Sequence, residues 1–152
     1  MILVAAIENH KNPEIDALIA EYVKRLQLLH PVSVQLLPSA KVQQAAQQQL
    51  KETESILKLA KPGDSIFLLD EKGKTTTSVE FSNFITQTLN QSRGKIIFGI
   101  GGAYGFSAEA KKQFPTIRMS DWVLPHQIAR LVLVEQIYRA FNIIKGTGYH
   151  HV

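Results

Sequence analysis

The sequence predicts an α/β protein built on a mostly parallel β-sheet. Expected strands and helices alternate along the 152 residues, and the expected strands are apolar along their whole length. Alternation favours parallel strands joined by helical crossovers, and continuous apolar strands indicate a sheet covered on both faces. No linker or repeat interrupts this pattern, so residues 1–152 are expected to form a single domain with a substantial core.

Five apolar runs predict the strands: residues 2–7, 32–37, 65–70, 95–100 and 116–119. The first helix is expected after Asn12, which is a suitable N-cap, with Pro13 at its first position and a stop before Pro31. A glutamine-rich exposed helix is expected within residues 41–59, its thin apolar stripe formed by Val42, Ala46, Leu50, Ile56 and Leu57. A loop is expected at residues 71–74.

Three more helices are expected in the second half of the chain. Ser78 is the expected cap of a helix that ends near Gly94, and Ser107 is the expected cap of a short helix through Lys112. The last and most apolar helix is expected at residues 127–145, closed by Gly146.

The composition is that of an ordinary globular protein with a modest basic excess. The net charge is +4 and the chain has no cysteine, which excludes disulfides, thiolate ligands and cysteine nucleophiles. The first seven residues lack a basic leader, and no apolar run approaches the roughly 20 residues that span a bilayer. We therefore expect a cytoplasmic protein without a membrane partner. An anionic partner such as RNA is compatible with the charge.

A glycine-rich turn at residues 99–105 follows the fourth expected strand. In a dinucleotide-binding unit such a turn follows the first strand, but here residues 8–11 contain no glycine, and Tyr104 stands where the third glycine of the fingerprint belongs. No Walker A sequence follows the glycines either. We therefore do not expect NAD or ATP.

Metal and serine chemistry are also poorly supported. His126, His150 and His151 are too few and too loosely spaced for a zinc set, and the sequence has neither HExxH nor Gly-x-Ser-x-Gly. We expect no metal. What remains is a ligand held by backbone groups and apolar contacts, beside a helix that carries Glu135 and Arg139.

Several motifs together resemble one family. They are Leu68-Leu69-Asp70 with Gly73-Lys74, the Ile100-Gly101-Gly102-x-x-Gly105 turn, Leu124-Pro125-His126-Gln127 with Arg130, Val134-Glu135-Gln136-x-Tyr138-Arg139-Ala140, and the Tyr149-His150 tail. Essentially the whole chain resembles the RlmH family, the bacterial 23S rRNA (pseudouridine-N3) methyltransferases of the SPOUT, or α/β-knot, class. Tyr104 departs from the smaller or polar residues usual in this turn.

The resemblance implies a three-layer sandwich with a C-terminal trefoil knot, acting as a homodimer on 23S rRNA in the assembled ribosome. It also implies S-adenosylmethionine as methyl donor, gripped by backbone from three segments. On this chain these correspond to Leu69, Gly101, Gly102, Met119, Ser120, Asp121, Trp122, Val123 and Leu124.

The last helix and the tail are expected to border the acceptor base. Glu135 or His150 is the candidate base for the acceptor proton, and Arg139 either stabilises the developing negative charge or holds a phosphate. Tyr149 and His150 are expected to fold over the site, from the same or the partner subunit. Candidate phosphate contacts are Arg130, Lys111, Lys112 and Lys145.

Three questions remain open at this stage. The apolar surface of the last helix exceeds one core stripe, which either a two-fold dimer or burial within one chain would explain. His126 is either a ligand contact or a structural residue of the corner. For the function, the alternatives are a knotted methyltransferase acting on another RNA site and a non-catalytic module that binds RNA or a small ligand.

Overall fold

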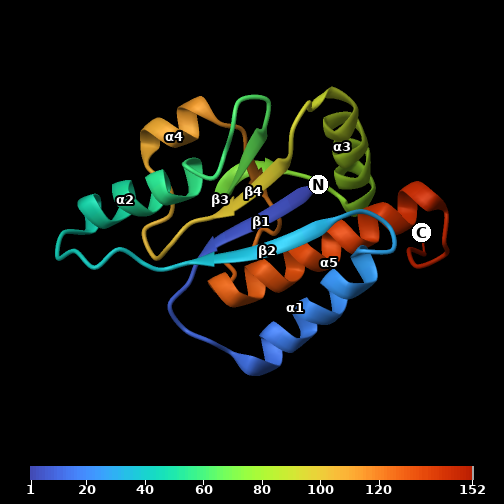
Figure 1. Ribbon diagram of the computed structural model, residues 1–152, viewed down its shortest axis with the longest axis horizontal. Coiled ribbons are helices and arrows are strands. Elements are labelled where there is room, and N and C mark those ends of the chain that lie inside the picture. The colour runs from blue at the N-terminus through green and yellow to red at the C-terminus, as the bar shows by residue number, and fades with distance from the viewer. Residues whose placement is uncertain (152) are drawn as a thin grey trace.

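The computed structural model describes residues 1–151, so Val152, the last residue of the expected domain, lies outside it. Strands and helices alternate as the sequence predicts (Figure 1). The strands are β1 (Ile2–Ile7), β2 (Val32–Leu37), β3 (Ser65–Thr75), β4 (Ile96–Ile100) and β5 (Thr116–Arg118). The helices are α1 (Pro13–Leu26), α2 (Ala45–Leu57), α3 (Ser78–Gln91), α4 (Ala108–Gln113) and α5 (His126–Lys145).

The five strands form one sheet in the order β2-β1-β4-β3-β5. Every neighbouring pair is parallel, which confirms the expected sheet. The two strands in the middle, β1 and β4, are buried along their whole length. Because all strands run the same way, their carboxyl ends meet at one edge of the sheet, where ligands bind in open α/β folds.

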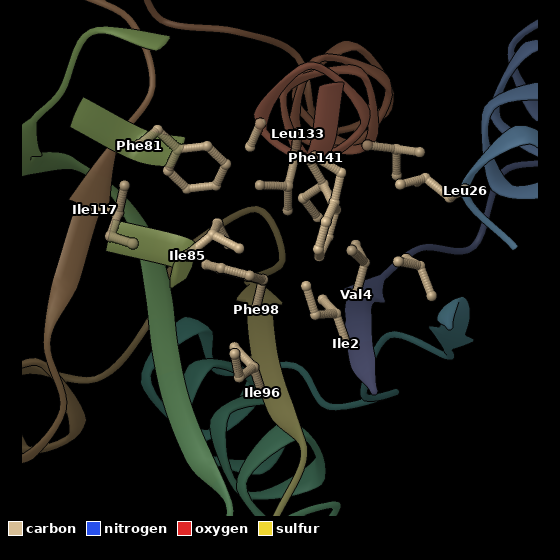
Figure 2. Packing of buried hydrophobic residues seen from close by; sticks show 14 of the residues in the cluster. Ile2, Val4, Leu26, Phe81, Ile85, Ile96, Phe98, Ile117, Leu133 and Phe141 are labelled. Carbon is tan, nitrogen blue, oxygen red and sulfur yellow. The ribbon is translucent and has the colours of Figure 1, made fainter. Parts of the chain in front are cut away.

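Helices cover the sheet on both faces, giving three layers. On one face, Ile2 and Val4 of β1 and Phe98 of β4 pack against α1, α3 and α5 (Figure 2). On the other face, Leu3 and Ala5 of β1 pack against Ile56 of α2 and Ala110 of α4. Successive side chains of a strand point to opposite faces, so an uninterrupted apolar β1 supplies both cores. Among residues 1–151, no helix is long and apolar enough to cross a membrane.

Side chains cap the helices at the expected ends, with one shift. Asn12 Oδ1 accepts a hydrogen bond from the Ile15 N–H at 3.2 Å, and Ser107 Oγ accepts one from the Ala110 N–H at 3.2 Å. The cap of α3 is Thr77 rather than Ser78, because Thr77 and Glu80 form a reciprocal capping box. The Ser78 hydroxyl is thereby left to donate to Gln136 Oε1 at 2.7 Å.

The predicted loop at residues 71–74 is wrong. These residues continue β3, which pairs with β5 twice: Leu69 is opposite Ile117, and after a register shift Lys74 is opposite the same residue. Polar and charged residues after Asp70 suggested a turn, but Lys74 and Thr75 still pair with the edge strand β5, beyond an irregularity in the ladder that takes up the residues between.

The predicted apolar stripe of α2 is wrong in part. Leu50 is 50% exposed, whereas Ile56 is buried together with two polar residues, Glu52 and Thr53. Glu52 lies four residues before Ile56 and therefore on the same helical face. The helix is turned so that this polar pair, and not Leu50, faces the sheet.

Asp64, in the turn before β3, joins the starts of β3 and β4. Its mostly buried carboxylate accepts hydrogen bonds from the Lys61 N–H at 2.9 Å and the Lys95 N–H at 2.8 Å, and pairs with Lys95 Nζ at 3.3 Å. Burial works to raise the pKa of Asp64, but these hydrogen bonds and the ammonium outweigh it, so the pKa lies below the ordinary 3.8.

This lowered pKa predicts a loss of stability in acid. A carboxylate whose folded pKa lies below its unfolded pKa stabilises the fold fully above the unfolded value, and that contribution disappears as the pH falls through the folded value. The difference in unfolding free energy between the wild type and Asp64→Asn should therefore be constant from pH 7 to about 5 and shrink below about 4. Urea denaturation across this range measures it. Glu54→Gln, which alters an exposed carboxylate, is the control and should show no such change.

Candidate functional site

A cavity of about 380 Å³ opens at the carboxyl ends of β4 and β5, beside the part of β3 that lies level with the end of β4. Its walls come from residues 69–71 within β3, from residues 100–105 at and after the end of β4, and from residues 117–120 and 122–124 at and after the end of β5, together with Lys111, His126 and Ala129. The volume is within the range of small-molecule sites. The glycine turn at residues 99–105 and the corner that contains Leu124 and His126 are separated along the chain. In the structure, both contribute residues to one cavity.

Eight of the nine residues expected to bind a cofactor line this cavity. The exception is Asp121, whose exposed carboxylate pairs with Arg118 Nη2 at 3.0 Å. Trp122 and Val123 stand at the mouth, where the Trp122 side chain is 83% exposed. His126 also lines the cavity as the first residue of α5, as its reading as a ligand contact requires.

The glycine turn places bare backbone on the cavity wall. The Gly105 N–H donates to the Gly102 carbonyl at 2.9 Å, and Gly105 has a φ of +63°, which favours glycine. A Cβ at position 101 would lie 3.0 Å from the Gly105 carbonyl carbon. Tyr104, which departs from the smaller residues expected in this turn, lines the cavity and is half exposed.

The cavity also carries a charged pair. Lys111 Nζ lies 3.0 Å from Asp70 Oδ2, and both residues line the wall. The pair offers one positive and one negative group to a ligand. Lys111, a candidate phosphate contact, is thus placed at the cavity.

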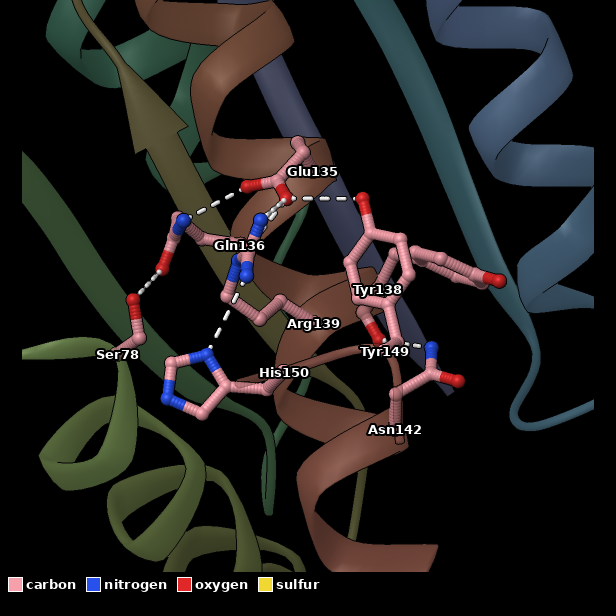
Figure 3. A network of polar contacts seen from close by, with 8 residues as sticks. All are labelled: Ser78, Glu135, Gln136, Tyr138, Arg139, Asn142, Tyr149 and His150. Atoms are coloured by element: carbon pink, nitrogen blue, oxygen red, sulfur yellow. Dashed lines mark hydrogen bonds and ion pairs between the residues drawn. The ribbon is translucent and has the colours of Figure 1, made fainter. Parts of the chain in front are cut away.

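The four residues expected to be catalytic form a second cluster, on the later half of α5 and the tail (Figure 3). Arg139 donates to Glu135 Oε1 from Nε at 3.0 Å and from Nη2 at 2.6 Å. Arg139 Nη1 lies 3.3 Å from His150 Nδ1, and the Tyr149 hydroxyl donates to Glu135 Oε1 at 3.2 Å. The Arg139 guanidinium carbon lies 4.9 Å from the centroid of the Tyr149 ring.

Charge in this cluster is fixed by its neighbours. The hydrogen bonds that Arg139 donates to Glu135 raise the pKa of Arg139, so the guanidinium is a permanent cation. Burial, followed by contacts with Tyr22 and Glu135, raises the pKa of Tyr149 well above its usual 10.0. Tyr149 is therefore a hydrogen-bond donor at neutral pH and not a phenolate. An arginine only donates, so His150 Nδ1 is the acceptor in their contact.

The cluster and the cavity are separate within one chain. None of Glu135, Arg139, Tyr149 and His150 lines the cavity. Along α5, Arg139 lies ten residues beyond Ala129 on the cavity wall, which is about 15 Å of helix. A single chain therefore does not bring the two sets of residues together.

Arg130 is not a surface residue, contrary to the prediction. Its side chain is 2% exposed and its Nη2 lies 2.6 Å from Asp16 Oδ1 of α1. The sequence showed a basic residue on an amphipathic helix, but this position faces α1 rather than solvent. Lys112 and Lys145 are exposed, as a phosphate contact requires.

Sequence reasoning missed three polar residues of α2 that contact the glycine turn from behind. They are Gln49, Glu52 and Thr53. Glutamines and glutamates in a polar helix gave no contrast with their neighbours. The available signal was the position of Glu52 one turn before the buried Ile56.

Comparison with known proteins places this geometry in a family. A family model described as "Predicted SPOUT methyltransferase" matches residues 1–150. The ribosomal RNA large subunit methyltransferase H of Flavobacterium psychrophilum is 39% identical over 99% of this chain and 98% of its own length. The chain belongs to this family of SPOUT methyltransferases.

Further relatives agree. The enzymes of the same name from Parabacteroides distasonis and Geobacter sp. are 41% and 40% identical, each over 88% of this chain and 87% of its own length. A solved structure described as "Structural insights into the 2-OH methylation of C/U34 on tRNA" superposes with a TM-score of 0.52 at 13% identity. It covers 95% of this chain and 97% of its own, and supports the fold alone.

The burial of Arg130 predicts a structural role in this methyltransferase. Arg130→Met should lower the free energy of unfolding by about 2 kcal/mol, because the partly exposed Asp16 loses its partner. Lys112→Met, at an exposed lysine, should change it by less than about 0.5 kcal/mol. Urea denaturation of both variants measures the difference, and equal stabilities would show that the buried ion pair does not matter to the fold.

Proposed function

We propose that this SPOUT methyltransferase transfers a methyl group from S-adenosylmethionine to N3 of a pseudouridine in 23S rRNA of the assembled ribosome. The observation that carries the proposal is the cavity at the carboxyl ends of β4 and β5, lined by the glycine turn and by residues 117–120 and 122–124. The near-full-length relatives named ribosomal RNA large subunit methyltransferase H support the substrate class. A cytoplasmic location, where ribosomes are found, follows from that substrate.

The residues present fit S-adenosylmethionine. The ligand combines an adenosine with a chain that carries positive and negative groups. The cavity offers exposed glycine backbone, apolar side chains such as Leu69 and Leu124, and the Asp70–Lys111 pair. We assign Leu69, Gly101, Gly102, Met119, Ser120 and residues 122–124 to holding it, and leave Asp121 out because it turns to Arg118.

When bound, S-adenosylmethionine supplies a methyl carbon already activated by a sulfonium. The protein therefore has to align donor and acceptor and stabilise the acceptor anion. Glu135 accepts hydrogen bonds from Arg139, Tyr149 and Gln136, so its carboxylate orients Arg139 rather than removing a proton. His150 Nδ1 is likewise occupied by Arg139.

We assign Arg139 to stabilising the negative charge on the acceptor base. Within residues 1–151, its contacts with Glu135 and His150 engage three of its five N–H groups. The remaining donors are available to an anionic oxygen of the base. Lys112 and Lys145, both exposed, are assigned to the RNA backbone.

A homodimer would unite the two halves of the site. Ile128, Val132, Glu135 and Arg139 share one face of α5, and Ile128 remains exposed while Val132 borders a second cavity of about 260 Å³. Val134, Ile137 and Phe141 are buried within the chain, so the surplus apolar surface is smaller than the sequence suggested. If two α5 helices cross antiparallel near Val132, two-fold symmetry sets Arg139 of one chain opposite residue 125 of the other.

The family also implies the trefoil knot, which we include in the proposal. In its support, β5 lies at the edge of the sheet, yet the following α5 packs on the central β1 and β4. The segment that leads from β5 to α5 contributes residues 119–120 and 122–124 to the same cavity as the glycine turn. We regard residues 1–152 as one domain.

Methylation of ribosomes from a strain that lacks the modification tests the function. Whole particles should be methylated by the wild type at one pseudouridine, mapped by mass spectrometry, and naked rRNA much less. Arg139→Lys should lower kcat about 100-fold, as loss of a charge-stabilising donor does. Arg25→Lys alters an exposed arginine with the same pairing to a glutamate and should have no effect.

Two results would replace the proposal by the alternatives. Methylation of another nucleotide would indicate a knotted methyltransferase acting on another RNA site. Binding of S-adenosylmethionine without transfer to any RNA would indicate a non-catalytic module.

Subunit mixing tests whether the tail acts in the partner's site. Ser120→Trp should fill the cavity, and deletion of residues 149–152 should remove the tail, so each protein alone should be inactive. Random exchange makes half of the dimers mixed, each with one complete site, so about one quarter of wild-type activity should return. If each tail serves its own chain, mixing restores nothing. The tail deletion should leave the dimer itself intact by light scattering.

A further inference from the structure

Glu52 of α2 is a buried carboxylate at the back of the glycine turn. Its side chain is 1% exposed. Oε1 accepts hydrogen bonds from the Ser39 hydroxyl, from the Ala40 N–H at 3.0 Å and from Gln48 Nε2 at 2.9 Å. Within residues 1–151, Oε2 has no hydrogen-bond partner. It lies against Gly102, where an added Cβ would overlap it.

Two neighbours of Glu52 hold the rest of the same segment. Gln49 Nε2 donates to the Tyr104 carbonyl at 2.7 Å and to the Phe106 carbonyl at 3.3 Å, and Thr53 Oγ1 accepts from the Ser107 N–H at 3.2 Å. Residues spaced by three and four share a helical face. One face of α2 therefore contacts the chain from residue 102 to residue 107.

This contact lies on the side of the turn away from the cavity. Gly101, Gly102 and Tyr104 line the cavity, and Gln49, Glu52 and Thr53 do not. A buried carboxylate oxygen without a hydrogen bond is unfavourable for folding. An apolar side chain would remove this cost but would leave the Ser39, Ala40 and Gln48 donors without their acceptor. Oε1 is therefore explained by these three donors, whereas the position of Oε2 against Gly102 is not.

We infer that Glu52 is a positioning residue for the methyl donor. Its carboxylate packs against the Gly102 backbone, prevents that backbone from moving away from the cavity, and so fixes the position of this part of the cavity wall. Ser39, Ala40 and Gln48 hold the carboxylate from the opposite side, which makes it a fixed stop rather than a mobile one. The inference rests on the proposed function, because it takes the turn to be the seat of S-adenosylmethionine.

Calorimetric titration with S-adenosylmethionine tests the inference on three variants. Glu52→Gln keeps the shape, and its amide oxygen accepts the same three hydrogen bonds, so the Kd should stay within about threefold of wild type. Glu52→Ala should raise the Kd about tenfold or more. Glu54→Ala, two residues further along the same helix and exposed, should change nothing. Should Glu52→Ala not fold, Glu52→Asp takes its place, because it withdraws the carboxylate from Gly102, and it should also weaken binding.

A double variant separates positioning from a general loss of stability. Gly102→Ala introduces a methyl group where Glu52 Oε2 lies, and should weaken binding by itself. In Glu52→Ala/Gly102→Ala the methyl group has room and replaces part of the stop, so the double variant should bind more tightly than either single variant. Independent losses would instead add. Unchanged binding by Glu52→Ala, or additive losses, would overturn the inference.

Hydrogen exchange without any ligand gives a separate readout. Amides of residues 102–107 should exchange faster in Glu52→Ala than in wild type or Glu54→Ala, while those of β1 should not change. Equal exchange in the turn would also overturn the inference. Failure of the wild type to bind S-adenosylmethionine would reject the proposed function, and the exchange measurement would still test the stop.

Discussion

The close passage of the chain against itself at the end of β4 is the constraint on which the site depends. At Gly101 an added Cβ would lie only 3.0 Å from the Gly105 carbonyl carbon, and at Gly102 an added Cβ would overlap Glu52 Oε2. The turn therefore lies between α2 on one side and the cavity on the other. Because β4 is central and buried, the turn starts from a rigid strand, and rigid elements hold a binding site more precisely than free loops do.

Helix α5 contributes to three parts of the structure along its length. Its first residues border the cavity, its apolar side chains Leu133, Ile137 and Phe141 complete the core on the face shown in Figure 2, and its later polar residues form the cluster of Figure 3. The core contacts fix the rotation of the helix. That rotation in turn decides that Arg130 turns inward to Asp16 and Arg139 outward to the tail.

Much of the fold could be predicted because local signals and tertiary packing agree. Asn12 and Ser107 cap the helices that the sequence predicts, and the uninterrupted apolar runs of β1 and β4 correctly indicate a sheet buried on both faces. The prediction of a loop at residues 71–74 failed because pairing with β5 overrode their polar, turn-like composition. The burial of Glu52 was not predicted for a related reason. The residues that surround it belong to segments about 13 and 50 residues away along the chain.

Among the candidate site residues, positions at strand ends were easier to predict than the partners of charged side chains. Eight of the nine residues predicted to hold a cofactor line one cavity, because most of them lie at or just after strand ends, which a parallel sheet brings together whatever the side chains are. Charged residues were predicted less well, because what an arginine does depends on the partner it meets. Arg25, Arg130 and Arg139 each pair with a carboxylate, but the first pair is exposed, the second ties two helices together, and only the third also contacts the tail. A guanidinium held in one orientation with donors to spare suits an anion that arrives from outside. Glu135 and His150 hold the guanidinium in this orientation, and Tyr149 is bonded to Glu135, which supports the proposal that the tail takes part in binding.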